Sequence, residues 1–314
     1  MNMKEGGSIY YGIIFLVIFS SGITHAQQQP MYTQYMFNGL VLNPAYAGSA
    51  ETFTATALFR KQWVGMTGAP ETQTFSAHSP VDDLVNRRRP GSPVSLGVTV
   101  FHDRIAITGQ TGLLAAYAYR IRTGRNASLS LGLQGGFSHN RIQYSDLELD
   151  DPSFSTGDVM EWQPEFGAGV YFKAARFYAG MSLPQMLRPA IERNNANISL
   201  APHLFISTGY VFDAGRDVKI KPNALLKTSK GAFQLDLNCN VFLKEIINFG
   251  LSWRSEESVS SLVQLQLNPR FAVGYAYDLG YGSEFARLSN GSHEMMVSYR
   301  VPKKNIRTIN PRFF

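Results

Sequence analysis

Apolar and polar residues alternate along most of the chain, in stretches of about ten residues that recur from residue 51 to residue 301. In residues 231–243, GAFQLDLNCNVFL, every second position from Phe233 to Val241 is apolar, and Gln234 to Asn240 between them are polar. Because successive side chains of a β-strand point to opposite faces, this alternation predicts strands with one apolar and one polar face. Fourteen such strands are expected, centred on residues 51–60, 71–79, 93–102, 111–122, 127–139, 163–173, 175–183, 202–213, 216–228, 231–243, 246–254, 258–268, 270–279 and 292–301.

A soluble antiparallel sandwich and a membrane barrel both show such alternation, so further features have to separate them. Long strands, an even strand number and aromatic residues at strand ends favour a barrel. We therefore predict an all-β fold, a transmembrane antiparallel outer-membrane β-barrel of about 14 strands, with the sandwich as the alternative. The aromatic pairs are Tyr117/Tyr119, Tyr171/Phe172, Phe177/Tyr178 and Tyr275/Tyr277.

Connection lengths give a second test of the barrel. The long connections, residues 140–162, 184–201 and 280–291, all follow odd-numbered strands, whereas those after strands four, six, eight, ten and twelve are short. Outer-membrane barrels have short periplasmic turns and longer outer loops, so this parity predicts that both termini are periplasmic. The exceptions are the long connection at residues 80–92 and two tight turns, SKG and SEE, on the long side.

The chain begins like a secreted protein. Lys4 precedes an apolar run from Ile9 to Ile23, and Thr24 and Ala26 have the small side chains of a cleavage site. We read residues 1–26 as a signal peptide; the alternative, a membrane anchor, is disfavoured because the run is shorter than the ~20 residues that span a bilayer. The expected organisation is then residues 27–50 as an N-terminal periplasmic or lumenal segment, 51–301 as the barrel and 302–314 as a periplasmic C-terminal tail.

The stretch from Met31 to Ala50 contains no charged residue, yet Asn38-Gly39 and Asn43-Pro44 interrupt it. The residue before a proline is disfavoured in a helix, so a buried or spanning helix is not expected. An apolar, turn-rich segment needs shelter from water. We expect it in the lumen or at the periplasmic mouth, with its aromatic residues packed and Asn43-Pro44 making the turn into the first strand; the aromatic residues are Tyr32, Tyr35, Phe37 and Tyr46.

Composition supports a membrane location. Charged residues make up 17% of the chain, below the roughly 25% of soluble domains, and Cys239 is the single cysteine, which excludes an intrachain disulfide. The net charge of +6 falls largely on the predicted periplasmic side. It favours an acidic periplasmic partner or lipid head groups over nucleic acid, with scattered solvated charge as an equal alternative.

No constellation of catalytic residues stands out. The chain has no nucleophile elbow, HExxH or phosphate-binding loop, and only His102 with Asp103, or His139 near Ser138, could be forced into a hydrolase. Residues 144–161 hold six carboxylates that could bind calcium, but their spacing matches no EF-hand, so a solvated acidic loop is favoured. We expect no enzyme activity, cofactor or metal.

Three segments near the two ends of the chain are distinctive: QYMFNGLVLNPAYAGS (34–49), FRKQWVGMTGAPETQTFSAHSPV (59–81) and GSHEMMVSYRV (291–301). Together they resemble the type IX secretion system membrane proteins of the PorP/SprF family. It covers both termini and the first two strands closely and the middle of the chain through its strand pattern. The family residues that map onto this sequence are Gln34, Tyr35, Asn38, Asn43, Pro44, Ala45, Tyr46, Ala47, Gly48, Arg60, Gln62 and Trp63.

The resemblance implies an outer-membrane component of a secretion machine that gliding bacteria also use. Family members are thought to bind secreted cargo, such as adhesins, through C-terminal sorting domains, or to work with the machine's periplasmic ring of lipoprotein and partner subunits. It implies no catalytic residues. A passive transporter of hydrophobic small molecules, with the N-terminal stretch as a plug, is the alternative function, and a barrel hydrolase is a third.

Overall fold

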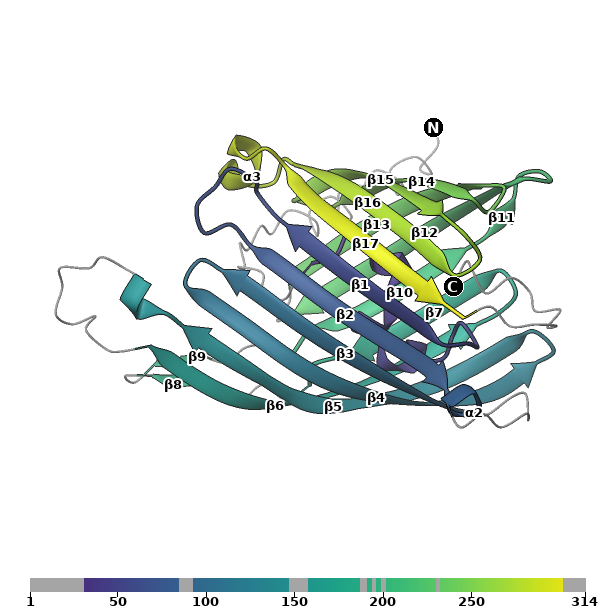
Figure 1. Cartoon of the computed structure of the whole chain (residues 1–314), viewed down its shortest axis with the longest axis horizontal. Helices are drawn as coiled ribbons and strands as arrows, with labels where there is room; N and C mark the ends of the chain where they lie inside the picture. The colour runs from purple at the N-terminus through teal and green to yellow at the C-terminus, as the bar shows by residue number, and fades with distance from the viewer. Residues whose placement is uncertain are drawn as a thin grey trace, which may run out of the picture.

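The computed structural model describes residues 31–84, 93–146, 158–186, 191–193, 196–198, 202–229 and 232–301, and they form a closed antiparallel barrel (Figure 1). The predicted signal peptide (1–26), the C-terminal tail (302–314) and most of the acidic loop lie outside the described residues. No described helix is long and apolar enough to cross a bilayer. The wall strands are β1 (Thr54–Lys61), β2 (Glu71–Pro80), β3 (Val94–Ile105), β4 (Thr108–Gly124), β5 (Ala127–Ile142), β6 (Val159–Lys173), β7 (Phe177–Leu183), β10 (Leu204–Tyr210), β11 (Phe212–Asp213), β12 (Val218–Ser229), β13 (Ala232–Leu243), β14 (Ile247–Arg254), β15 (Ser258–Gln266), β16 (Phe271–Gly280) and β17 (Ser292–Arg300).

Each strand pairs with its neighbours in sequence, and the first strand pairs with the last. In the β1–β17 ladder Thr54 lies opposite Arg300 and Lys61 opposite His293. Both β10 and β11 pair with β12, so they are one wall strand interrupted at Val211. Counted in this way the described wall has fourteen strands, and the predicted fold is confirmed. A small hairpin of β8 (Ile191–Arg193) and β9 (Ala196–Ile198) forms a separate sheet.

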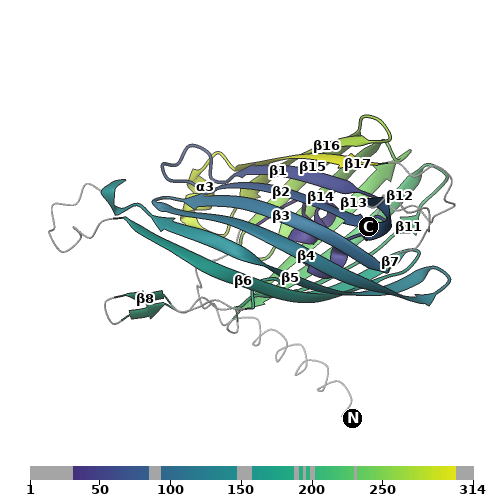
Figure 2. The same cartoon turned by 60° about the horizontal axis from the view of Figure 1, so that its bottom comes forward.

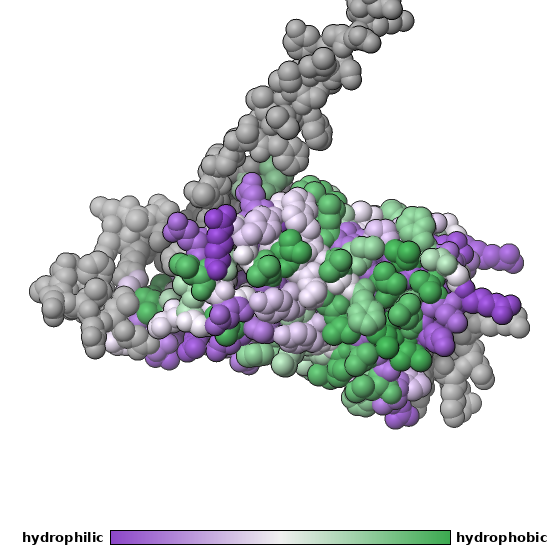
Figure 3. Space-filling model, turned by 90° about the horizontal axis from the view of Figure 1, so that it is seen from above, coloured by the Kyte–Doolittle hydropathy of each residue, from purple (hydrophilic) through white to green (hydrophobic). Residues whose placement is uncertain are grey.

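The two faces of the wall are inverted relative to a soluble protein. In β5 the polar Ser130, Gln134 and Ser138 are buried inside the barrel, while Leu133 and Phe137 are each 63% exposed on the outside. In Figure 3 hydrophobic residues gather in patches on the outer wall, with hydrophilic residues toward both ends. An apolar exterior around a polar interior is the arrangement that a bilayer requires.

The two ends of the barrel differ in their connections. At one end, the turn end, strands β4 to β5, β6 to β7 and β13 to β14 are joined by two or three residues. At the other end, the loop end, lie the strand ends that the long connections join, from β5 to β6, from β7 to β10 and from β16 to β17, the last with α3 (Glu284–Leu288). The turn end also has the long exception that was predicted near residue 85, which begins with α2 (Val81–Leu84).

The N-terminal segment, residues 31–53, lies inside the ring of strands (Figure 2), and we call it the plug. It has three short 3₁₀ helices, η1 (Tyr35–Phe37), η2 (Gly39–Val41) and η3 (Pro44–Tyr46). Its side chains form two buried clusters with inward-facing wall residues, one around Tyr46, Tyr171 and Tyr178 and one around Tyr32 and Leu225. The core of this barrel is therefore the contact between the plug and the wall.

Candidate functional site

The upstream end of the plug is held by a buried group of charges near the loop end. Arg60 from β1 contacts Asp278 of β16 at 2.6 Å and Glu294 of β17 at 3.1 Å, and all three side chains are at most 3% exposed. Glu294 accepts the backbone N–H groups of Thr33 and Gln34, each at 2.8 Å. The Thr33 hydroxyl donates to Asp278 and accepts from Arg60. We call Arg60, Asp278 and Glu294 the clamp.

A second charged group adjoins the clamp. Arg254 donates to the backbone oxygen of Tyr32 at 3.1 Å and to Asp236 at 3.0 Å. Lys227 contacts the same Asp236 at 3.3 Å, and Glu257 contacts Arg254 at 3.1 Å. Buried charges persist only when they are paired and hydrogen-bonded, so these side chains and the plug backbone stabilise one another.

The middle of the plug is held by neutral contacts. The Asn43 side chain accepts the Ala45 N–H at 2.9 Å, which caps η3, and donates to the Val170 backbone oxygen at 3.0 Å. The prediction that Asn43-Pro44 makes the turn into the first strand is wrong. Pro44 is instead the first residue of η3, a position that proline favours, and β1 begins only at Thr54. A Cβ atom at Gly132 would overlap the plug backbone at Ala45, so only glycine allows this close approach.

The downstream end of the plug reaches the turn end of the barrel. The Gly48 N–H donates to His78 Nδ1 at 3.0 Å, and its carbonyl oxygen accepts from Arg120. The Ser49 carbonyl accepts from Lys173 at 3.0 Å. Along β17, Glu294 in the clamp and Arg300 at the turn end are six residues apart, or about 20 Å at ~3.3 Å per residue. The plug therefore runs along the lumen from one end to the other.

Three plug tyrosines are buried in the lumen. Tyr32, Tyr35 and Tyr46 are each at most 8% exposed. Tyr32 shares a 2.9 Å hydrogen bond with Thr74 of β2, and Tyr46 packs edge-on to Tyr171 at 5.4 Å. These rings contact the wall through packing and neutral hydrogen bonds.

The family residues fall into three places in the structure. Arg60 belongs to the clamp, while Gln62 and Trp63 follow β1 at the loop end, where the Trp63 N–H donates to Ser292. Asp278, Glu294 and Arg254 were missed by the sequence reasoning, although a charged residue at an inward-facing strand position was an available signal. The remaining family residues are all buried in the plug: Gln34, Tyr35, Asn38, Asn43, Pro44, Ala45, Tyr46, Ala47 and Gly48.

The pairs considered for hydrolysis do not come together as catalytic pairs. His102 Nδ1 hydrogen-bonds the Thr111 hydroxyl at 2.7 Å, and Asp103, on the opposite face of β3, accepts from Thr72. Ser138 donates to Glu165 inside the barrel, whereas the His139 ring packs on Trp162 at 4.8 Å. Within the described ranges no group of three metal-ligating side chains occurs.

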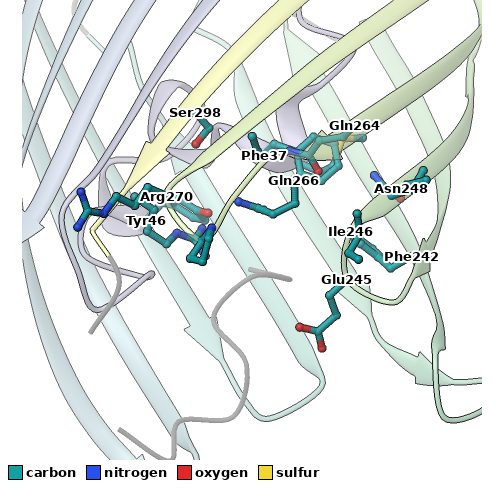
Figure 4. Close-up of a pocket in the computed structure, with 15 residues that line it drawn as sticks. Phe37, Tyr46, Phe242, Glu245, Ile246, Asn248, Gln264, Gln266, Arg270 and Ser298 are labelled. Carbon is teal, nitrogen blue, oxygen red and sulfur yellow. The ribbon is translucent and has the colours of Figure 1, made fainter. Parts of the chain in front are cut away.

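Two pockets lie beside the plug. The pocket in Figure 4 is at the turn end and is open to solvent, and we call it the mouth pocket. Phe37 and Tyr46 of the plug line it together with Glu245, Arg270 and Arg300 at the strand ends. A second, smaller pocket, the side pocket, lies between the plug and β3 to β7, and none of the described side chains that line it is charged. The two pockets thus offer different chemistry at different places.

These features define an integral outer-membrane β-barrel whose lumen is occupied by its own N-terminal segment. A family model described as "Type IX secretion system membrane protein PorP/SprF" matches residues 24–299, so the chain belongs to that family, and the predicted resemblance is confirmed. The protein is an outer-membrane component of the type IX secretion system.

Solved structures share the fold at low identity. The CymD monoaromatic hydrocarbon channel is 10% identical, with 90% of this chain and 96% of that chain covered and a TM-score of 0.50. The Ralstonia pickettii toluene transporter TbuX is 8% identical, with 84% and 93% covered and a TM-score of 0.50. No curated protein matches the chain in sequence. At these identities the structural matches support the barrel fold alone.

Proposed function

We propose that this protein is a non-enzymatic docking component of the type IX machinery, with its turn end facing the periplasm. At that mouth it binds the C-terminal sorting domain of a secreted cargo of the adhesin type, or a subunit of the periplasmic ring. The observation that carries the proposal is the contrast between a lumen filled by the plug and an open mouth pocket at the turn end. A filled lumen suits binding at the mouth better than passage through the barrel.

Short turns support the orientation. In outer-membrane barrels the short connections face the periplasm, where the ring subunits and unexported cargo are found. Val301 then lies at the periplasmic mouth, where its carbonyl oxygen accepts from Thr52, and the clamp lies in the outer half of the lumen. Met31 lies near the clamp, so the plug begins in the outer half and not at the periplasmic mouth.

The charge of the turn end indicates what kind of partner fits. Among its described residues basic side chains outnumber acidic ones, and two of the acidic groups are already paired, Asp213 with Arg176 at 2.5 Å and Glu245 with Lys219 at 2.8 Å. A basic rim attracts an acidic partner surface and increases its rate of association. The basic side chains at this end are Arg122, Arg125, Lys173, Arg176, Arg216, Lys219, Lys244, Arg270 and Arg300.

The apolar floor of the mouth pocket adds a second requirement. Phe37, Tyr46 and Phe242 lie beneath the polar rim, and aromatic residues in a pocket are typical energetic centres of protein interfaces. The partner should therefore present an apolar or aromatic side chain surrounded by carboxylates.

A pull-down in mild detergent tests the proposal. The full-length protein is purified from its own membranes, and co-purified proteins are identified by mass spectrometry. We expect ring lipoproteins or a fragment of a large adhesin with the native chain, and at least several-fold less with Arg270→Glu at the mouth pocket. Arg104→Glu, an exposed site in β3 at the loop end, is the matched control and should leave recovery unchanged.

Two results would contradict the proposal. One is equal recovery of the same partners with both variants, which would exclude the turn end as their binding surface. The other is normal type IX secretion and surface adhesin display in cells that lack the gene.

A further inference from the structure

Charge is distributed unevenly along the lumen. In the half near the loop end, wall carboxylates such as Asp278 and Glu294 lie beside basic side chains such as Arg60. In the half near the turn end, the charged side chains of the described wall strands that are buried or half-buried are all basic. They are Arg120, Lys173, Lys219, Lys221 and Arg300.

Two of these cations hold the last part of the plug, residues 47–53, which we call the plug turn. Arg120 of β4 donates to the Gly48 carbonyl, and Lys173 of β6 donates to the Ser49 carbonyl at 3.0 Å. The Glu51 carboxylate lies 3.4 Å from Arg120. The plug turn therefore offers these two cations two neutral carbonyls and one carboxylate.

The backbone of the plug turn is strained. Gly48 has a φ of +72° and Glu51 a φ of +56°, a region that a side chain as long as glutamate rarely adopts. A Cβ atom at Gly48 would overlap the Ser95 side chain of β3, so the turn fits against the wall only with glycine there. Strained backbone persists only where the surrounding contacts hold it. Loss of the contacts to Arg120 and Lys173 would therefore release the turn.

The plug turn is accessible from the turn end of the barrel. The Glu51 side chain is 40% exposed and that of Arg120 14%, whereas the clamp side chains are at most 3% exposed. Two segments outside the described residues follow strands that end there, 85–92 and 302–314, and neither contains an aspartate or a glutamate. Neither segment can therefore supply a carboxylate to Arg120 or Lys173.

The chemistry of these contacts favours a carboxylate from another chain. A carboxylate has a full negative charge, and its two oxygens match the fork of an arginine, so it is a stronger acceptor than a backbone carbonyl. Glu51 already shows that Arg120 accepts a carboxylate in this place. A segment with several carboxylates would compete with this single one.

We propose that Arg120 and Lys173 bind the carboxylates of an acidic peptide segment of the docked partner, and that this exchange releases the plug turn from the wall. The inference rests on the proposed function, because it requires a partner at the turn end. The clamp and the contacts of Asn43 take no part in the exchange, so the rest of the plug stays in the lumen.

A cysteine reporter in the plug turn tests the exchange. Ser49, which is 4% exposed, is replaced in the full chain by Ser49→Cys together with Cys239→Ser, and the protein is placed in lipid nanodiscs. The probe is a hexaglutamate peptide with one phenylalanine, blocked at both ends. We expect it to increase the rate of reaction with a neutral maleimide at least several-fold. The matched hexaglutamine peptide should leave the rate unchanged.

A second reporter shows how much of the plug moves. Leu40 of η2 is 2% exposed, and Leu40→Cys, again with Cys239→Ser, should react slowly with either peptide present. Folded electrophoretic mobility shows that each reporter chain forms the barrel.

Two substitutions in the reporter chain change the competition itself. Glu51→Gln removes the carboxylate of the plug turn, so half of the effect should need a several-fold lower concentration of hexaglutamate. Glu71→Gln, in β2 at the loop end, is the control and should leave that concentration unchanged. Lys173→Met removes one of the two cations, so it should increase the rate without peptide and weaken the further response to hexaglutamate.

The inference is overturned if hexaglutamine has the same effect as hexaglutamate, if the Leu40→Cys reporter responds as strongly as Ser49→Cys, or if Glu51→Gln leaves the required concentration unchanged. Its failure is distinguishable from failure of the docking proposal. Unchanged partner recovery with Arg270→Glu contradicts docking. Reduced recovery with Arg270→Glu, together with a Ser49→Cys reporter that stays slow with hexaglutamate, contradicts only the release of the plug turn.

Discussion

The two halves of the plug are held in the lumen by different physical means. The upstream half, at Thr33 and Gln34, is bound by a buried group of ion pairs, in which Arg60 of β1 meets carboxylates of β16 and β17 that are more than 200 residues away in sequence. The downstream half, from Asn43 to Ser49, is bound by aromatic packing, by close approach to glycine and by separate hydrogen bonds to its backbone, two of them from Lys173 and Arg120. Buried ion pairs hold a segment strongly, but removal of one partner leaves the other charge buried and unpaired. Packing depends on how closely two surfaces fit, so its loss affects mainly the residues in contact.

The largest effect is expected in the clamp. Glu294→Ala removes the acceptor of two plug N–H groups and leaves Arg60 with Asp278 alone in a buried place. Removing one partner of a buried ion pair costs about 3–5 kcal/mol. We expect a corresponding loss in the free energy of unfolding, measured by urea titration in lipid vesicles, and faster proteolysis of the plug.

The matched control for the clamp is an ion pair that is partly exposed. Lys61 of β1 and Glu71 of β2 are 2.8 Å apart. Glu71→Ala should change stability by no more than about 1 kcal/mol, since exposed ion pairs contribute little. Equal losses for Glu294→Ala and Glu71→Ala would show that the clamp does not hold the plug.

The second-largest loss of stability is expected where the downstream half of the plug packs closely against the wall. Gly132→Ala places a methyl group against the plug backbone at Ala45, so η3 or β5 has to move. Overpacking of this kind costs about 1–3 kcal/mol. Gly109→Ala, in the neighbouring strand β4, meets no atom within 4 Å and is the control. The same urea titration should show a loss for Gly132→Ala and near-native stability for Gly109→Ala; the reverse order would exclude close packing as the reason for glycine at 132.

Much of the fold was predictable because it depends on local alternation. The predicted and observed strands agree within a few residues, as for 231–243 against Ala232–Leu243, since a membrane barrel repeats one period-two pattern in every strand. The widest deviations are at β4 and β6, which begin three and four residues before the predicted segments, at Thr108 and Val159. In β4 the added residues, Thr108 to Gln110, are small or polar like those of a loop, so the alternation begins later than the strand.

The site was predictable only in part, because it is assembled across the barrel. The uncharged stretch from Met31 to Ala50 indicated a sheltered segment, but nothing local relates Thr33 to Glu294, which is 261 residues away. The sequence placed Asp278 and Glu294 on the polar faces of their strands without showing that both meet Arg60.

The smallest loss of stability is expected at Asn43, whose side chain both caps η3 and hydrogen-bonds the wall. Asn43→Ala removes both the cap of η3 and the hydrogen bond to Val170, and loss of a helix cap costs about 0.5–2 kcal/mol. Asn43→Asp keeps an oxygen for the Ala45 N–H but cannot donate to Val170. If the cap matters more, Asn43→Asp should be more stable than Asn43→Ala in the urea titration. If the two variants lose the same free energy, the bond to the wall matters more, and the downstream half of the plug is then held by β6 and not by its own helix.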